Sequence, residues 1–267
     1  MKVVILCGGQ GTRLREHTQH LPKPMVAVGG RPLLWHIMKG YSRYGFHDFV
    51  LCLGYKGECI KEYFANYAIA SSDFTVRLAR GRPLEFHGQS DERSWNVTLV
   101  DTGEHAMTGA RLRRVAPHLD GERFLLTYGD GVADVDFEAL CSFHRSHGRL
   151  ATVTGVHPPA RFGELVLDGN RVTSFSEKPQ VRRSWINGGF FVFERAVLDR
   201  LSEGDGCVLE REPLERLARE DQLRAFLHEG FWQCMDTHRD WTSLNEAWER
   251  GAAPWKTWDR ELVGTPR

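Results

Sequence analysis

Short apolar runs alternate along the chain with segments of helical periodicity, and this alternation is the main structural signal in the sequence. The runs that predict buried strands cover residues 2–7, 49–53, 124–128, 151–156 and 190–193. The segments that predict helices begin at Pro32, span Cys59 to Tyr67, and span Leu209 to Arg219. Such an order predicts an α/β fold with one mixed, mostly parallel sheet flanked by helices. The polar segment 71–94 shows no clean period.

The first predicted strand ends in a glycine-rich segment, Gly8-Gly9-Gln10-Gly11-Thr12-Arg13-Leu14, and Pro22-Lys23-Pro24-Met25 follows it. Three glycines within four residues leave backbone N–H groups open to an anion. Arg13 and Lys23 add two positive charges to the same place. The pattern therefore predicts a phosphate-binding loop at the carboxyl end of the strand.

Two better-known glycine motifs do not fit this loop. The dinucleotide fingerprint requires a third glycine where the chain has Leu14, which weighs against a nicotinamide oxidoreductase. The P-loop requires Gly-Lys followed by Ser or Thr, and no such triplet occurs in the chain. The loop must therefore serve another kind of phosphate chemistry.

Composition narrows the class of protein. The 267 residues suffice for a single domain, 1–267, and no linker or repeat divides them. The 35 basic and 35 acidic residues cancel, which argues against nucleic acid as a partner. The six cysteines form no C-x-x-C pair, which predicts no zinc site and a reducing, cytoplasmic setting. No apolar stretch reaches eighteen residues, so no membrane span is expected.

The order G-G-x-G-T-R-L, then P-K-P-M, resembles the signature of the sugar-phosphate nucleotidylyltransferases, which join a sugar 1-phosphate to an NTP and release pyrophosphate. The resemblance runs almost end to end, and the stretch from Trp95 to Gly103 and the Trp-rich tail are similar to the cytidylyl branch. Further stretches that carry it are 34–38, 54–57, 60–67, 128–132, 187–192, 230–233 and 254–258.

The resemblance implies a Rossmann-like sheet of the nucleotide-diphospho-sugar transferase type, with a Trp-rich arm from about residue 240. It also implies a homo-oligomer, a hexamer or a tetramer, built through residues 71–94 and this arm. Trp248, Trp255 and Trp258 are expected to anchor the oligomer. His144 and His147 lie three positions apart on a predicted helix, and no carboxylate or third histidine accompanies them. They are therefore expected to be exposed helix residues rather than metal ligands.

The implied reaction is in-line attack by a phosphate oxygen of α-D-glucose 1-phosphate on the α-phosphorus of CTP, giving CDP-glucose and pyrophosphate. That oxygen is already anionic near neutral pH, so no general base is needed. Arg13 is expected to bind the leaving pyrophosphate, and Lys23 the α-phosphate and the incoming phosphate. Asp130 and Asp236 are expected to hold Mg²⁺. The product would feed deoxysugar synthesis for cell-surface polysaccharide or for glycosylated metabolites.

The resemblance also implies the contacts to each substrate. Those expected at the nucleotide are Leu6, Gly8, Gly9, Gly11, Thr12, Arg13, Lys23, Thr108, Gly109, Arg111 and Gly129. Those expected at the sugar phosphate are Phe162, Gly163, Glu177, Lys178, Asn187 and Gly188.

Two alternatives stay open from the sequence. One keeps the reaction and changes the base, which gives a uridylyl- or thymidylyltransferase acting on glucose 1-phosphate. The other is a regulatory subunit that binds sugar nucleotides without catalysis. The presence of Arg13, Lys23, Asp130, Lys178 and Asp236 weighs against the second alternative.

Overall fold

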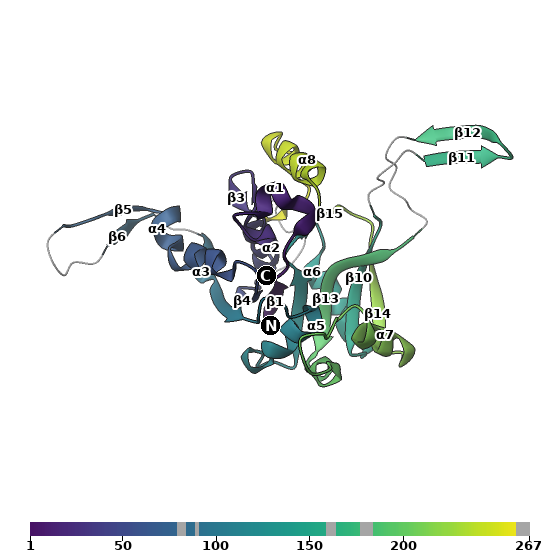
Figure 1. The fold of residues 1–267 in the computed structure, drawn as a ribbon, viewed down its shortest axis with the longest axis horizontal. Helices are drawn as coiled ribbons and strands as arrows, with labels where there is room; N and C mark the ends of the chain where they lie inside the picture. The colour runs from purple at the N-terminus through teal and green to yellow at the C-terminus, as the bar shows by residue number, and fades with distance from the viewer. Residues whose placement is uncertain (79–83, 89–90, 159–163, 177–183, 260–267) are drawn as a thin grey trace, which may run out of the picture.

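A computed structural model describes residues 1–78, 84–88, 91–158, 164–176 and 184–259. Its centre is a seven-stranded sheet in the order β14-β10-β13-β8-β1-β4-β7 (Figure 1). The strands are β1 (Val3–Leu6), β4 (Asp48–Leu53), β7 (Asn96–Asp101), β8 (Arg123–Tyr128), β10 (Ala151–Val156), β13 (Ile186–Glu194) and β14 (Leu223–His228).

The pairing directions make this sheet mixed but mostly parallel. Strand β1 runs parallel to both of its neighbours, β4 and β8, and the pairs β4–β7 and β10–β14 are parallel too. Only β13 is reversed, because it pairs antiparallel with both β8 and β10. The predicted fold class is therefore confirmed.

Alternate side chains of the central strand enter two separate cores, one on each face of the sheet. Val3 and Ile5 lie in one core, while Val4 and Leu6 lie in the other. A strand buried on both faces reads as an unbroken apolar run, which explains the strength of the first sequence signal.

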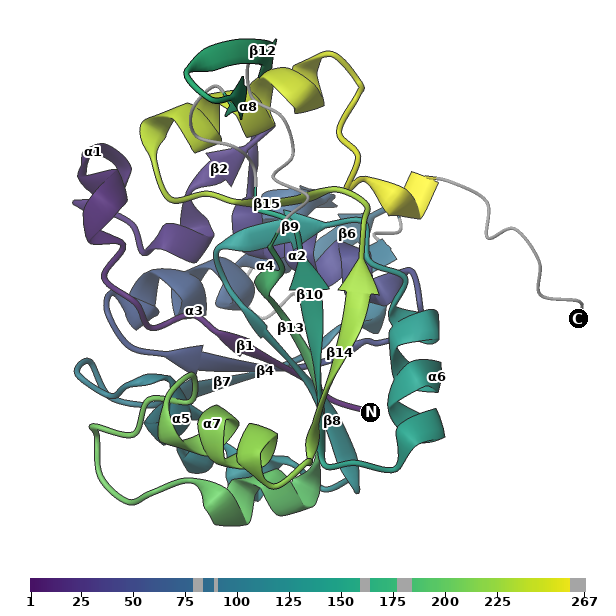
Figure 2. The ribbon, with the colours of Figure 1, turned by 90° about the vertical axis from the view of Figure 1, so that its right-hand side faces the viewer.

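Helices cover both faces of the sheet (Figure 2). Helices α2 (Leu33–Ser42) and α6 (Phe137–His147) pack into the core that holds Val3, and α5 (Thr108–Arg114) and α7 (Glu212–Arg219) into the other. The remaining α-helices are α1 (Arg15–Thr18), α3 (Gly57–Ala65), α4 (Tyr67–Ser71) and α8 (His238–Glu249). The 3₁₀ turns are Thr12–Leu14, Lys23–Met25, Asp91–Ser94, Ala116–His118, Arg195–Arg200 and Thr257–Asp259.

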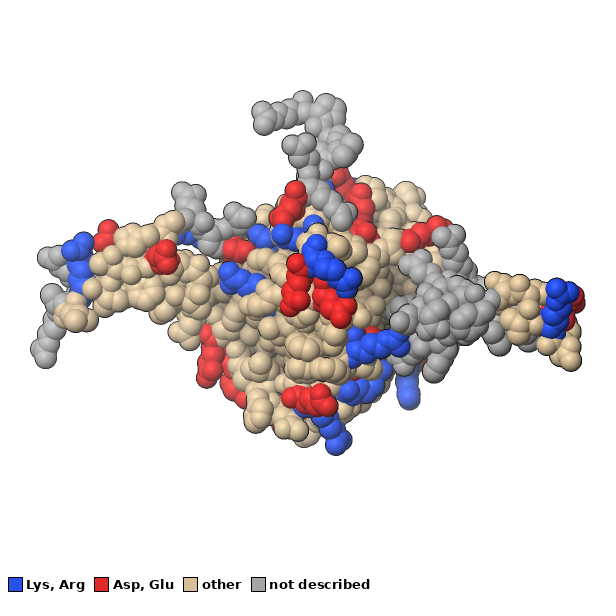
Figure 3. Space-filling view, turned by 90° about the horizontal axis from the view of Figure 1, so that it is seen from above, with Lys and Arg blue, Asp and Glu red and all other residues tan. Residues whose placement is uncertain are grey.

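Four two-stranded ribbons complete the fold. They pair β2 (Ala27–Val28) with β3 (Arg31–Pro32), β5 (Asp73–Thr75) with β6 (Glu85–His87), β9 (Gly131–Ala133) with β15 (Trp232–Cys234), and β11 (Glu164–Asp168) with β12 (Arg171–Ser176). The ribbons β5–β6 and β11–β12 project from opposite sides of the body, as Figures 1 and 3 show. Around the body in Figure 3, basic and acidic side chains are interspersed.

The segment after residue 237 folds back onto the N-terminal half. Thr237 and Asp240 form a reciprocal cap at the start of α8. Asn245 on this helix accepts a hydrogen bond of 2.9 Å from the backbone N–H of Gly29. Beyond the helix, Trp255 is 2% exposed and stacks on Phe231. The expectation that Trp255 anchors an oligomer is wrong, because its indole is already buried within its own chain.

His144 also departs from expectation, because it is buried. Its Nδ1 lies 2.8 Å from Thr152 Oγ1, and its Nε2 lies 3.3 Å from Glu194 Oε1. The helix α6 that carries it packs its His144 face onto β10 and β13 rather than presenting it to solvent. Spacing along a helix alone did not reveal which face the sheet would cover.

Candidate active site

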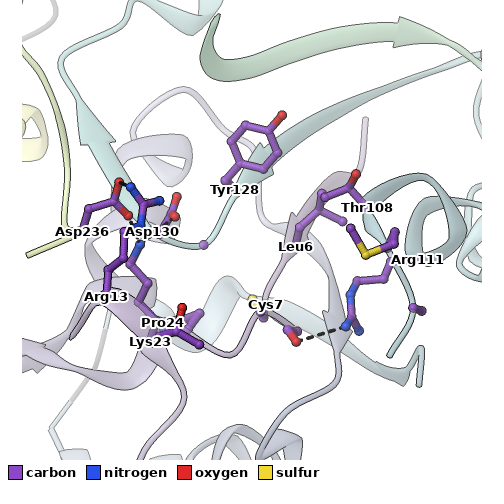
Figure 4. Close-up of a pocket in the computed structure, with 17 residues that line it drawn as sticks. Leu6, Cys7, Arg13, Lys23, Pro24, Thr108, Arg111, Tyr128, Asp130 and Asp236 are labelled. Carbon is purple, nitrogen blue, oxygen red and sulfur yellow. Dashed lines mark hydrogen bonds and ion pairs between the residues drawn. The ribbon is translucent and has the colours of Figure 1, made fainter. Parts of the chain in front are cut away.

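A cavity of about 330 Å³ lies at the carboxyl ends of β1 and β8 (Figure 4). The two strands are parallel neighbours with Leu6 paired to Tyr128, so the segments that follow them leave the sheet side by side. Ligands of open α/β sheets bind at such a place. The residues that line the cavity are Leu6, Cys7, Gly8, Gly9, Gly11, Thr12, Arg13, Lys23, Pro24, Ala106, Met107, Thr108, Arg111, Tyr128, Gly129, Asp130 and Asp236.

Close packing shapes the glycine loop in this cavity. A Cβ on Gly8 would lie 2.1 Å from Arg111 Nη1, so a side chain does not fit there. Gly11 has a φ of +61°, in the left-handed region that favours glycine. A Cβ on Gly9, by contrast, would meet nothing within 4 Å. Two of the three glycines are therefore required by the loop's own packing.

Arg111 holds this loop to the neighbouring strand ends. Its guanidinium is buried and donates hydrogen bonds to the carbonyl oxygens of Leu53, Gly103, Gly8 and Glu104 and to Thr102 Oγ1. Burial lowers the pKa of Arg111, yet an arginine stays charged at neutral pH. Arg111 was expected to contact nucleotide, and the structure places it in the cavity wall with its donors directed at protein oxygens.

Four charged side chains meet at one end of the cavity (Figure 4). Lys23 Nζ lies 2.9 Å from Asp130 Oδ2 and 2.6 Å from Asp236 Oδ1. Arg13 Nη1 lies 2.9 Å from Asp236 Oδ2. These four side chains form one charged cluster. It consists of Arg13 from the glycine loop, Lys23 from the Pro-Lys-Pro turn, and Asp130 and Asp236 from two distant parts of the chain.

Two members of the charged cluster, Lys23 and Asp236, have pKa values that their charged neighbours shift. Burial would lower the pKa of Lys23, but the charges and hydrogen bonds of Asp130 and Asp236 outweigh burial and raise it. Burial would likewise raise the pKa of Asp236, but Lys23 and Arg13 hold it below its ordinary value. The cluster therefore carries both signs of charge at neutral pH.

The ribbon β9–β15 brings the two aspartates together. Gly131 pairs with Cys234 in this antiparallel ribbon, so Asp130 and Asp236 emerge at the same end of it. The N–H of Met235 donates to the carbonyl of Asp130 over 2.8 Å. Asp240 Oδ2 accepts a hydrogen bond of 3.1 Å from the N–H of Asp236, which ties the second aspartate to the cap of α8.

The aspartate pair suits a divalent cation with a preference for oxygen. Both carboxylates already converge on a single cation, the Lys23 ammonium, within 2.9 Å. Mg²⁺ binds through one or two carboxylates together with phosphate oxygens of its substrate. The donor set therefore fits Mg²⁺ in the presence of a nucleotide.

A hydrogen-bonded chain runs behind the other part of the cavity. Thr108 Oγ1 donates to Glu210 Oε2 over 2.6 Å, and Tyr128 Oη donates to Glu210 Oε1 over 2.5 Å. Asn187 Nδ2 donates to the Tyr128 hydroxyl over 3.2 Å. Burial, followed by the carboxylate of Glu210, raises the pKa of Tyr128, so its hydroxyl keeps its proton. Neither Tyr128 nor Glu210 was among the catalytic or substrate-binding residues expected from the sequence.

The other expected residues fall into three groups. Gly109 lies outside the cavity lining, and its N–H donates to the carbonyl of Cys207 over 2.9 Å. Asn187 and Gly188 lie on β13 beyond Tyr128 and do not line the cavity. Phe162, Gly163, Glu177 and Lys178 lie outside the described residues.

Within the described part of the chain, no helix combines the length and apolar character needed to cross a membrane.

Residues 2–250 match the family described as "Nucleotidyl transferase". The chain therefore belongs to the nucleotidyl transferase family. Over 260 residues it is 55% identical to a protein of Salmonella typhi named "Glucose-1-phosphate cytidylyltransferase", covering 97% of this chain and 100% of that one. It is 42% identical over 258 residues to the "Probable glucose-1-phosphate cytidylyltransferase" of Bacillus subtilis (strain 168), with the same coverage.

The fold is also found in solved structures of low sequence identity. The crystal structure of HddC from Yersinia pseudotuberculosis aligns with a TM-score of 0.65 at 21% identity. The alignment covers 92% of this chain and 99% of HddC. At this identity the likeness concerns the fold alone.

Proposed function

We propose that this protein transfers a cytidylyl group from CTP to α-D-glucose 1-phosphate, giving CDP-glucose and pyrophosphate. The observation that carries the transfer chemistry is the charged cluster at the mouth of the glycine loop. It combines an arginine, a lysine and two carboxylates at hydrogen-bond distances within one cavity. Positioning and charge neutralisation are what phosphoryl-type transfer demands of a protein.

The proposed reaction needs no proton abstraction. A phosphate oxygen of glucose 1-phosphate forms a bond to the α-phosphorus of CTP, while the bond from that phosphorus to the oxygen shared with the β-phosphorus breaks. The electron pair of the broken bond leaves with pyrophosphate. Arg13, whose side chain is 66% exposed at the cavity mouth, can clasp two oxygens of that leaving group.

Lys23 acts at the centre of the transfer. Its ammonium is a compact charge on a flexible stem, so it can turn from the carboxylates toward phosphate oxygens. We propose that it neutralises the α-phosphate and the approaching sugar phosphate, which otherwise repel each other.

We further propose that Asp130 and Asp236 hold Mg²⁺ when CTP is bound. Bound there, the ion would draw negative charge from the triphosphate oxygens and favour departure of pyrophosphate. The chain supplies two carboxylate ligands fixed by the ribbon β9–β15.

The choice of cytosine is supported by the relatives that carry the cytidylyl name over their full length. Leu6 and Thr108 border a part of the cavity that lies away from the charged cluster, where a base can lie (Figure 4). A pyrophosphate-release assay with CTP, UTP, dTTP and GTP, each with glucose 1-phosphate and Mg²⁺, tests the choice. We expect CTP to give the highest kcat/KM. A preference for UTP or dTTP would establish the uridylyl or thymidylyl alternative instead.

We propose a cytoplasmic homo-oligomer, a hexamer or a tetramer, whose product supplies deoxysugar synthesis for cell-surface polysaccharide. The β5–β6 ribbon and the residues that follow β5 support self-association, because Phe86 on β6 and Val76 and Leu78 after β5 are exposed, with Leu78 94% exposed. All six cysteines are free, as in a reducing compartment. Light scattering should give four or six protomers, and Leu78→Asp should lower that number. A monomeric wild-type protein would refute the assembly.

A further inference from the structure

Glu210 joins two residues of the cavity lining, Thr108 and Tyr128, without bordering the cavity itself. It lies in the turn before α7, and both of its carboxylate oxygens are used. Oε2 accepts from the Thr108 hydroxyl over 2.6 Å, and Oε1 accepts from the Tyr128 hydroxyl over 2.5 Å. Thr108 and Tyr128 both line the cavity, and they come from α5 and β8.

Glu210 sets the direction of the hydrogen bonds that it makes with the two hydroxyls, and of those that continue from Tyr128 to β13. An ionised carboxylate only accepts, so both hydroxyls must donate to it. The Tyr128 oxygen is then left with its lone pairs, and it accepts from Asn187 Nδ2 over 3.2 Å. Asn187 Oδ1 in turn accepts from the N–H of Gly189 over 2.8 Å. One carboxylate thereby orients side chains as far as β13.

The two hydroxyls differ in how much they need Glu210. Thr108 also accepts a hydrogen bond of 2.9 Å from the N–H of Leu209, and its backbone lies in α5. The Tyr128 hydroxyl, among the described residues, is held by Glu210 and Asn187 only. Loss of the carboxylate therefore releases Tyr128 and Asn187 more than Thr108.

The backbone beside Asn187 is packed closely against the same tyrosine. A Cβ on Gly189 would lie 2.4 Å from Tyr128 Cδ2, so the tyrosine ring packs directly against the backbone of β13. The carbonyl of the adjacent Gly188 accepts a hydrogen bond of 2.7 Å from Trp232 Nε1. The position of Tyr128 thus determines how β13 presents Asn187 and Gly188.

We propose that Glu210 is a positioning residue that aligns the sugar-phosphate region with the nucleotide region through Tyr128 and Asn187. The proposal rests on the proposed function, because it assumes that the β13 side of Tyr128 receives the sugar phosphate. It assigns a role to a carboxylate that touches neither substrate.

Steady-state kinetics of Glu210→Gln test the proposal. The two hydroxyls use different oxygens of Glu210, and the amide turns one of these oxygens into an NH₂ donor, so one hydroxyl loses its acceptor. We expect the KM for glucose 1-phosphate to rise about tenfold or more, as the loss of a hydrogen bond to a charged group implies, while the KM for the triphosphate changes less than about threefold. The matched control is Glu212→Gln, an exposed glutamate two positions along in the first turn of α7, which should leave both values unchanged.

A double variant separates positioning from a general structural role. Tyr128→Phe removes the hydroxyl that Glu210 holds, so Glu210→Gln should add little to its effect on the KM for glucose 1-phosphate. Independent, multiplicative effects would overturn the proposal. So would an unchanged KM for glucose 1-phosphate in Glu210→Gln, or a rise in both KM values that parallels a fall in melting temperature. If the wild-type protein prefers another triphosphate, the cytidylyl assignment fails, and the same comparison is made with that triphosphate.

Discussion

Lys23 and Asp236 are 213 positions apart in the sequence, yet Lys23 Nζ lies 2.6 Å from Asp236 Oδ1. Each side chain is about nine-tenths buried, with 10% of its surface exposed. The lysine thus offsets the negative charges of Asp130 and Asp236, which would otherwise repel each other. It also occupies the oxygens that we assign to Mg²⁺, so metal binding and a turn of Lys23 toward phosphate should occur together.

Replacement of Lys23 by methionine should separate folding from catalysis. Lys23→Met keeps the apolar stem and removes the charge, so we expect kcat/KM to fall by about 10²–10³, as for other preorganised donors. Without the ammonium, Asp130 loses its cation and Asp236 keeps only Arg13, so Mg²⁺ should raise the melting temperature of the variant more than that of the wild type. Lys61→Met, at an exposed position on α3, is the control. Near-normal turnover in Lys23→Met would refute the central role of this lysine.

Removal of either aspartate should abolish metal dependence together with activity. For Asp130→Asn and Asp236→Asn we expect turnover to fall at least about 100-fold, because a lost carboxylate weakens Mg²⁺ at the triphosphate. EDTA should stop the wild-type reaction, and added Mg²⁺ should restore it. Asp120→Asn, at a side chain 79% exposed and away from the cavity, should behave as wild type. Full activity of the wild type in EDTA would contradict the assignment.

Two adjacent glycines offer a test of the loop packing. In Gly8→Ala the new Cβ would lie 2.1 Å from Arg111 Nη1, which displaces the guanidinium from its carbonyl partners. We expect a loss of about 1–3 kcal/mol in the free energy of unfolding, typical of overpacking. Gly9→Ala meets no protein atom within 4 Å and should leave stability within about 0.5 kcal/mol of wild type. Urea unfolding of both variants measures the difference, and equal stabilities would show that the loop relaxes freely.

Acid stability should depend on His36, which is 1% exposed and lies beside Trp248 and Trp255. Its Nε2 donates to the carbonyl of Val28 over 2.8 Å. Burial, only partly offset by hydrogen bonds to backbone, lowers the pKa of His36 from 6.5 to about 4. Because the folded state holds the neutral ring, His36 stabilises the protein above pH 6.5, and this contribution is lost as the pH falls from 6.5 toward 4.

The expected size of this acid effect is about 3 kcal/mol, from about 1.4 kcal/mol for each unit of pKa. Urea unfolding at a series of pH values should show it as a decline in the free energy of unfolding between pH 6.5 and 4. His36→Gln removes the titrating group, so its decline over this range should be shallower. An identical pH dependence in both proteins would place the acid sensitivity elsewhere.

Local features were predicted best from the sequence. The glycine loop, Arg13 and Lys23 are close in the chain, and the apolar run of β1 is buried on both faces, so each signal is strong. The helix expected from Leu209 begins at Glu212, because Pro213 fits the first turn of α7 rather than its interior. The helix expected to reach Tyr67 is interrupted at Asn66.

Features set by tertiary pairing were not predicted from pattern. Strand β7, at the sheet edge, mixes polar and apolar residues, and its longest apolar run is the pair Leu99-Val100. The ribbon β5–β6 pairs only three residues on each side, too few to give a period. The hydrogen bonds of Arg111 depend on oxygens from three other segments, namely Gly8, Leu53 and 102–104. Glu210 stands in a turn among other charged residues, so nothing in the sequence sets it apart. No spacing rule connects such residues before the fold is known.

The ribbon β9–β15 has a consequence for the order in which the protein is made. The ribosome synthesises the glycine loop, Lys23 and Asp130 long before Asp236. Asp236 comes only after β15, which ends at Cys234. Until ribosomes have added that ribbon and the first turn of α8, the nascent chain holds a lysine and one carboxylate with no second ligand. A partly synthesised protein can therefore build much of its sheet without possessing a complete charged cluster, so transfer activity should arise only after Asp236 and the first turn of α8 have been added.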